Sequence, residues 1–247
     1  MPPALLVFVP ASCSAQVLAA ARDAAVGAGA AGVCVDYVGG DAASAPAADV
    51  NAWRMRLDVA DDAARLPPIG SPDSRATPTL LLQLTSTAVH DTPSSPRTMP
   101  RAAAAVNAAA RITGQLGARI ALEPAPGCWM QRLEDACRLA MRVNRPDVGV
   151  AFSLDAWRAA DGDAAHLPDR LRLAGPRLWA VSCSLPTVQG AALHRDLPRL
   201  GQLLNAIQYR GPVIVDAMVP RDAITDTARV KTIVAQAITI VRRLITA

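Results

Sequence analysis

The chain has 247 residues, of which 51% are hydrophobic and 19% charged, with a formal net charge of +4. This balance excludes a disordered chain, which needs less apolar and more charged sequence. The arginines form no basic tract and only 3% of residues are aromatic, so we expect no nucleic-acid partner. No apolar run reaches the roughly 18 residues of a membrane span, so we expect no membrane partner either.

Short apolar runs alternate with segments of helical periodicity along the whole chain. We expect strands at residues 5–9, 31–38, 53–59, 79–85, 119–123, 148–154, 179–184 and 213–219. We expect helices at residues 14–27, 101–116, 129–143, 167–173, 197–209 and 226–246, the first of them capped by Ser14. Regularity fails over residues 41–78, so the N-terminal half is expected to be shortened.

The N-terminal apolar run has no positively charged start and breaks at Pro10, which indicates a first strand of a cytoplasmic protein and not a secretion signal. The five cysteines follow neither a disulfide nor a zinc spacing, so we expect reduced thiols. A nucleophilic role for Cys128 or Cys183 is disfavoured because no histidine stands at a predictable distance from either thiol.

The alternation of about eight continuously apolar strands with helices predicts an α/β fold with a parallel sheet. A (β/α)8 barrel of the TIM type, formed by residues 1–247 as a single domain, is favoured over a doubly wound open sheet. The open sheet is the weaker alternative because the first turn contains no glycine and no nucleotide-binding glycine motif occurs in the chain.

Active sites of such barrels lie at the C-terminal ends of the strands, and two carboxylates follow apolar runs there. Glu123 is one of only two glutamates in the chain, and Asp216 follows the last strand run in the same way. A carboxylate after an apolar strand is costly to bury unless it is paired or bound to a cation. We therefore expect Glu123 and Asp216 to act as metal ligands or acid–base groups, or else to bond loop amides at the rim.

Further polar and aromatic residues fall near the ends of the other strands, and we expect them to contact a substrate. They are His90, Trp129, Ser153, Asp155 and Ser182.

Four stretches in the C-terminal half resemble the sugar phosphate isomerase/epimerase group of xylose isomerase-like TIM barrels. In order, they are GARIALEPAPGCWMQRLEDACRLAMRV, VGVAFSLDAW, GPRLWAVSCS and YRGPVIVDAMV. The resemblance covers roughly the segment 117–219, whereas the N-terminal half shares only the rhythm of strands and helices.

The resemblance implies one divalent metal, manganese, zinc or magnesium, held at the ends of the last four strands. Glu123 occupies the position of the fifth-strand glutamate, and Asp216 keeps an oxygen ligand on the eighth strand. Other positions depart from the pattern: Ser153 and Ala156 replace an Asp-x-x-His pair, and Ser182 replaces a histidine. Serine and alanine cannot supply the donors that hold a transition metal.

Two hypotheses follow for the function. The first is an isomerase or epimerase that moves a proton on a sugar or related polyol through Glu123 and Asp216, with or without a divalent metal. The second is a non-catalytic barrel that binds a small molecule or serves as an accessory protein after loss of the ligands. The sequence leaves the oligomeric state open.

Overall fold

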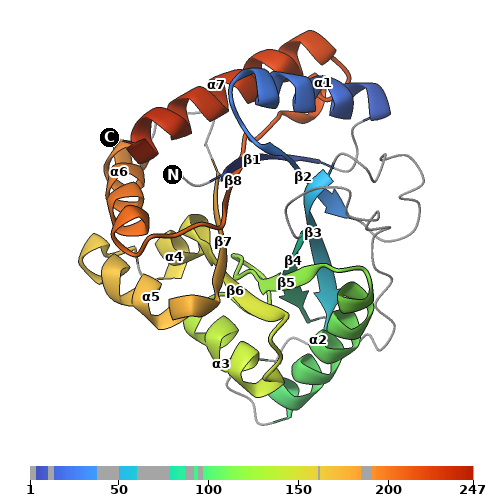
Figure 1. Ribbon diagram of the computed structural model, residues 1–247, viewed down its shortest axis with the longest axis vertical. Helices are drawn as coiled ribbons and strands as arrows, with labels where there is room; N and C mark the ends of the chain where they lie inside the picture. Colours follow the sequence, from blue (N-terminus) through green and yellow to red (C-terminus); the bar gives the residue numbers. More distant parts are fainter. Residues whose placement is uncertain are drawn as a thin grey trace.

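A computed structural model gives the structure of the protein, which describes most of the chain. The described residues are 4–10, 14–37, 50–59, 78–86, 92–93, 97–160, 162–184 and 191–246. Within them, eight parallel strands form a closed barrel in the order β1 to β8, with β1 paired to β8 (Figure 1). The predicted (β/α)8 barrel is therefore confirmed, and the open sheet is excluded because a closed barrel has no edge strand.

The strands are β1 (Ala4–Val9), β2 (Gly32–Tyr37), β3 (Val50–Asp58), β4 (Thr79–Thr85), β5 (Arg119–Leu122), β6 (Val148–Ser153), β7 (Leu178–Ser184) and β8 (Pro212–Asp216). The helices are α1 (Ala15–Gly27), α2 (Thr98–Gln115), α3 (Leu133–Val143), α4 (Leu154–Ala160), α5 (Leu167–Ala174), α6 (Ala191–Ala206) and α7 (Thr227–Thr246). The described residues also form three short 3-10 turns, η2 (Ala164–His166), η3 (Gly175–Arg177) and η4 (Arg221–Ala223). That residues 1–247 form a single domain stays a prediction.

The predicted strands recur within one to three residues at each end, and three differences have local causes. The expected start of α3 at residue 129 is wrong, because the Trp129 amide donates to the Leu84 carbonyl at 2.9 Å and Arg132 is still extended, so that the helix begins at Leu133. α4 was not predicted; it begins directly after β6, where the Ser153 hydroxyl accepts a 3.2 Å hydrogen bond from the Ala156 amide. β8 ends at Asp216, since its carboxylate bonds the Met218 amide and turns the chain there.

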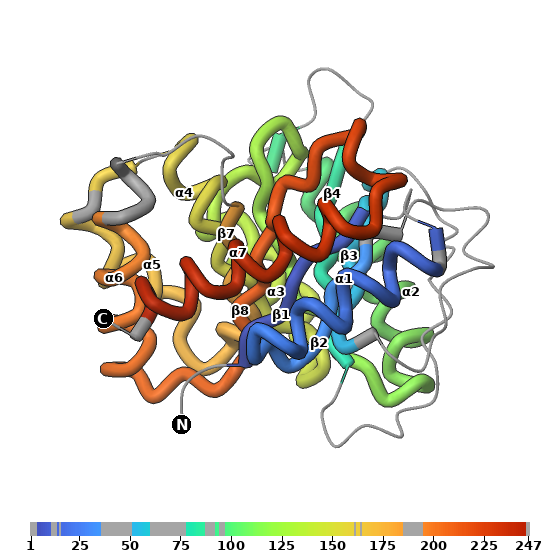
Figure 2. The backbone as a smooth tube through the Cα atoms, turned by 90° about the horizontal axis from the view of Figure 1, so that it is seen from above, coloured from blue at the N-terminus to red at the C-terminus, as the bar shows by residue number. Residues whose placement is uncertain are grey.

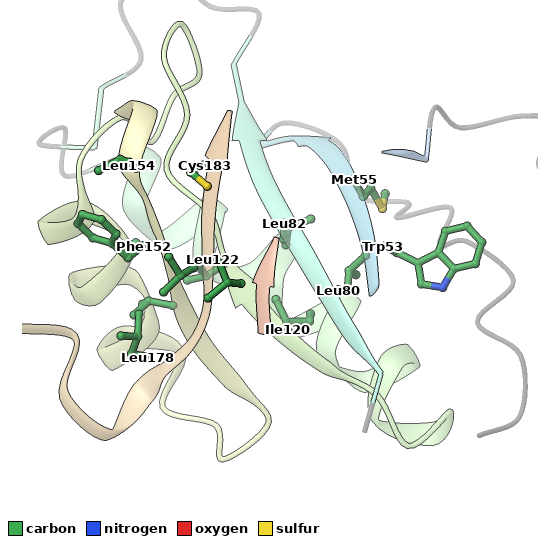
Figure 3. Packing of buried hydrophobic residues seen from close by; sticks show 14 of the residues in the cluster. Trp53, Met55, Leu80, Leu82, Ile120, Leu122, Phe152, Leu154, Leu178 and Cys183 are labelled. Carbon is green, nitrogen blue, oxygen red and sulfur yellow. The ribbon is translucent and has the colours of Figure 1, made fainter. Parts of the chain in front are cut away.

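The helices lie around the outside of the barrel, and their contact with the outer face of the strands forms the main hydrophobic core. Figure 3 shows labelled members of this core, among them Leu80 and Leu82 on β4 and Ile120 and Leu122 on β5. Alternate residues of each strand point to the outside, which is the period of two that a strand dictates. The first and the last helix, α1 and α7, pack side by side in this outer layer (Figure 2).

A smaller buried cluster fills the inside of the barrel. It consists of Leu6, Phe8, Cys34, Ala52, Leu81, Ala121, Ala151, Ala180 and Ile214. Four of these nine residues are alanines, so the barrel axis is packed with short side chains. Among the described helices, none is long and apolar enough to cross a membrane.

Candidate functional site

On strands β3 to β8, the mouth of the barrel is lined by the residues that lie two positions beyond the residue of the inner cluster. Because strand side chains repeat with a period of two, these residues point to the same inner face, one layer nearer the C-terminal ends. They are Arg54, Gln83, Glu123, Ser153, Ser182 and Asp216. We call this set the mouth layer. It contains four of the site residues predicted from the sequence, Gln83, which also stands near a predicted strand end, and Arg54, which the sequence reasoning missed.

Glu123 lies at the centre of the mouth layer and is almost fully buried, with 1% of the residue exposed. Its two carboxylate oxygens accept hydrogen bonds from Nε and Nη2 of Arg54, at 2.8 and 2.9 Å. Oε2 also accepts a 2.8 Å bond from the amide nitrogen of Gln83, whose own oxygen accepts from Arg56 at 3.3 Å. Glu123 is therefore a carboxylate already satisfied by protein donors, in a bidentate pair of the strong type.

Arg54 is the cation of the mouth layer, and three groups from different strands surround it. Besides Glu123, its guanidinium carbon lies 4.3 Å from the centroid of the Phe8 ring, and its Nη1 lies 3.9 Å from Oδ2 of Asp216. Burial alone would lower the pKa of Arg54, but the carboxylate of Glu123 offsets this and raises the pKa above its ordinary value. The guanidinium is permanently charged and fixed in place.

Asp216 is the carboxylate of the mouth layer that stays accessible, with 22% of its side chain exposed. Oδ1 accepts a 2.8 Å hydrogen bond from the Met218 amide, while Oδ2 faces Arg54 without a hydrogen bond to it. Burial raises the pKa of Asp216, and the Met218 amide and Arg54 oppose that shift. Its Oδ2 is therefore the oxygen of this layer best placed to accept a proton.

Asp155, Ser153 and Ser184 form hydrogen bonds that hold the backbone at the rim of the barrel. Asp155 lies in the first turn of α4, where its Oδ2 accepts bonds from the Ser184 amide at 2.8 Å and the Ser184 hydroxyl at 2.6 Å. Ser153 is buried and caps α4, and Ser182 is buried on the inner face of β7. Asp155 therefore joins the beginning of α4 to the end of β7, and its role in binding substrate stays a prediction.

The remaining substrate-binding predictions fall elsewhere. Trp129 is a buried core residue whose indole nitrogen has no hydrogen-bond partner among the described residues. Its backbone amide bonds the carbonyl of Leu84 at 2.9 Å, so Trp129 fastens the loop after β5 to β4. His90 lies outside the described residues.

A cavity of about 150 Å³ opens beside the mouth, between the ends of β5 and β6 and the helices α3 to α5. Ser153 and Ala156 line it, and these are the two positions where the family resemblance expects an aspartate and a histidine. Glu134 and Arg170, which form an ion pair, line the same cavity. The shorter side chains at 153 and 156 thus leave open space where metal ligands would stand.

The expected divalent metal does not fit the mouth layer as these residues are arranged. Both oxygens of Glu123 accept bonds from Arg54, and the guanidinium lies between Glu123 and Asp216, where a shared ion would have to lie. In the part of the chain that the structure describes, no three or more His, Cys, Asp or Glu side chains gather closely enough to hold a metal. That Glu123 and Asp216 act as metal ligands stays a prediction from the sequence, and this arrangement of side chains does not support it.

The sequence does contain a signal for Arg54. In the run WRMRLDV, which begins in β3, apolar and polar residues alternate. The apolar ones belong to the main hydrophobic core outside the barrel, and they are Trp53, Met55, Leu57 and Val59. That alternation places the residues between them on the inner face, so it identifies Arg54 as a mouth residue. It was missed because only the last residues of each strand were considered.

The cysteines supply a prediction about reactivity, because Cys34, Cys128, Cys137 and Cys183 are all buried and none of these four forms a disulfide. Burial raises the pKa of Cys137 to about 11 and that of Cys183 to about 12. Since the thiolate is the reactive form, we expect neither residue to react with iodoacetamide in the folded protein at pH 8. Mass spectrometry of the two cysteine peptides, with urea-unfolded protein as control, measures this. Rapid labelling of Cys183 in folded protein would contradict the burial described.

Comparison with known proteins places the fold in a family. The model of the family described as xylose isomerase-like TIM barrel matches residues 78–236, which is more than half of the chain. No curated protein matches the sequence.

Solved structures share the fold at low sequence identity. The D-allulose 3-epimerase of Methylomonas sp., in complex with D-allulose, has a TM-score of 0.65 at 16% identity, with 98% of each chain covered. D-psicose 3-epimerase of Clostridium cellulolyticum H10, with D-tagatose, has a TM-score of 0.67 at 12% identity, covering 98% of this chain and 99% of that one. The family 2 AP endonuclease of Brucella melitensis has a TM-score of 0.57 at 20% identity, covering 87% and 92%.

Proposed function

Because this chain belongs to the family of xylose isomerase-like TIM barrels, we propose that it interconverts isomers of a sugar or related polyol by moving a proton at the barrel mouth. One observation carries the proposal: Asp216 presents an accessible oxygen 3.9 Å from the fixed guanidinium of Arg54. A carboxylate beside a fixed positive charge is the pair of groups that proton transfer next to a carbonyl requires.

The reaction that this pair can perform moves one carbon-bound proton and needs no external oxidant or reductant. Oδ2 of Asp216 accepts the proton from a hydroxyl-bearing carbon next to the substrate carbonyl, the electrons of the broken C–H bond form a C=C bond, and the carbonyl π electrons move onto the carbonyl oxygen. The Arg54 guanidinium stabilises the negative charge on that oxygen. Return of the proton to the former carbonyl carbon, with the hydroxyl proton of the first carbon shifting to the former carbonyl oxygen, gives an isomer. Return of the proton to the first carbon, after the substrate has turned the other face of that carbon toward Asp216, gives an epimer.

Glu123 takes a different part in this scheme from the one the sequence predicts. Its oxygens already accept three hydrogen bonds from Arg54 and Gln83, so the carboxylate has little capacity left to accept a proton. We assign Glu123 the role of positioning Arg54 and assign the proton transfer to Asp216.

Incorporation of deuterium from D2O tests the function, with D-allulose, D-fructose and D-tagatose as probe sugars and NMR as the readout. We expect Asp216→Asn to lower the exchange rate by about 100-fold or more, as loss of a general base does. Asp23→Asn, on the exposed surface of α1, is the matched control and should keep the wild-type rate.

The thermal stability of the same variant separates a lost base from a damaged fold. The folded-state pKa of Asp216 is raised, so its ionised form costs stability as the pH rises above the unfolded pKa. Asp216→Asn removes that cost, and its melting temperature at pH 7 should equal or exceed that of the wild type. Full exchange activity in this variant would refute the assignment of the base.

The non-catalytic barrel remains the second candidate, and the serine and alanine at positions 153, 156 and 182 favour it. If none of the probe sugars exchanges deuterium but one of them raises the melting temperature, binding without catalysis is the function.

A further inference from the structure

Arg54 lies where two carboxylates of the mouth converge, at 2.8 Å from Glu123 and 3.9 Å from Asp216. We infer that its guanidinium is the built-in cation of this barrel, in the place that a divalent ion would otherwise take, and that its unused donors bind an oxygen atom of the ligand. This inference concerns the cation and not the reaction, so it does not depend on the proposed function.

The guanidinium is held more firmly than a flexible surface arginine would be. Glu123 fixes one edge through two parallel hydrogen bonds, and the ring of Phe8 faces the guanidinium carbon at 4.3 Å. Gln83 in turn fixes the carboxylate of Glu123. A planar fork of donors suits such a bidentate pair and stacks on an aromatic ring, which a lysine ammonium does not reproduce.

The donors that Glu123 leaves unused point to a ligand. A guanidinium has five N–H donors, and within the described part of the chain hydrogen bonds use Nε and one donor of Nη2. Nη1 lies 3.9 Å from Asp216, which is beyond hydrogen-bond distance. Only 13% of the side chain is exposed, so these donors need an acceptor other than bulk water. A carbonyl or hydroxyl oxygen of a small molecule supplies one.

The charge and the donor set explain why an arginine can take this place. Glu123 and Asp216 together offer carboxylate oxygens on two sides of the guanidinium, and such oxygens suit manganese or magnesium. The guanidinium balances one of these two negative charges with a cation that a chelator cannot remove. Loss of Arg54 would leave these oxygens without a positive charge, and the mouth should then accept a divalent ion from solution.

Manganese binding by wild-type protein and by Arg54→Ala tests this, measured from the EPR signal of free Mn²⁺ and from the melting temperature. We expect no stoichiometric binding by the wild type and no effect of EDTA on its melting temperature. We expect the variant to gain one Mn²⁺ site, with its melting temperature raised by about 3–6 °C at ten times the dissociation constant. The double variant Arg54→Met/Glu123→Gln keeps the mouth filled but lacks the central carboxylate, so it should gain no site.

Two results would overturn the inference. One is stoichiometric Mn²⁺ binding by the wild type at micromolar concentration, and the other is a folded Arg54→Ala protein that gains no Mn²⁺ site. If Arg54→Ala does not fold, Arg54→Gln takes its place, because it also removes the charge while retaining part of the side-chain volume. If neither folds, the measurement on the wild type decides alone, absence of binding supporting the inference.

Discussion

Replacement of Glu123 by alanine is expected to lower the free energy of unfolding by about 3–5 kcal/mol, the largest effect of any single change in the mouth layer. The carboxylate is 1% exposed and accepts both hydrogen bonds of the Arg54 fork. Its removal leaves a guanidinium in a site where 13% of the side chain is exposed, with Asp216 at 3.9 Å as the remaining carboxylate of the mouth layer. Urea unfolding at pH 7 measures the loss.

A double variant without either charge shows whether the lost stability comes from the broken ion pair or from lost side-chain volume. The variant Arg54→Met/Glu123→Gln removes both charges and keeps most of the packing, so it should be more stable than Glu123→Ala and close to the wild type. If the double variant is as unstable as the alanine variant, packing and not the buried charge would be the cause.

The sequence was sufficient to predict the barrel because the outer core depends only on local patterns. Strands such as Thr79–Thr85 are short apolar runs with clear limits, and each is followed by a segment of helical periodicity. The end of β6 was harder to predict. Leu154 extends the apolar pattern of the strand beyond Phe152, whereas in the structure α4 begins at Leu154. The cap that starts this helix is a single hydroxyl, that of Ser153, and the residue types around it do not show which way the chain turns.

The candidate site was predictable only in part, because its central interaction joins residues 69 positions apart. Glu123 was found as a rare carboxylate after an apolar run, and the need for a cation beside it followed from the cost of burying its charge. Which cation serves could not be read from strand ends, since Arg54 lies in the middle of β3. β3 and β5 pair with the two edges of β4, and this strand order places the two charges together.

The loss of ligand residues and the presence of Arg54 are consistent with each other. A site with Asp, Glu and His ligands needs a cation of charge two to balance its carboxylates, whereas Glu123 and Asp216 are the acidic groups among the six residues of the mouth layer. A single guanidinium balances one of these and leaves the other able to accept a proton. Ser153 and Ser182 are uncharged, so they add no negative charge that a second cation would have to balance.

Outside the mouth, Gly201→Ala is expected to lower the free energy of unfolding by about 3 kcal/mol, although alanine is the better helix former. Gly201 lies in α6, and a Cβ atom there would stand 2.8 Å from the Cα and carbonyl carbon of Ile245 in α7, and closer still to the carbonyl oxygen. A backbone cannot rotate away as a side chain can, so α6 and α7 must separate. That strain exceeds the roughly 1 kcal/mol that alanine gains over glycine inside a helix.

Gly27→Ala is the control, because Gly27 is the last residue of α1 and a Cβ atom there would meet no heavy atom within 4 Å. Its free energy of unfolding should stay unchanged or rise by up to about 1 kcal/mol, the propensity effect alone. Thermal and urea unfolding of the two variants side by side measure the difference between them. Equal stability of the two would mean that α6 and α7 tolerate a methyl group at their contact, so that the close approach at Gly201 does not constrain the outer layer.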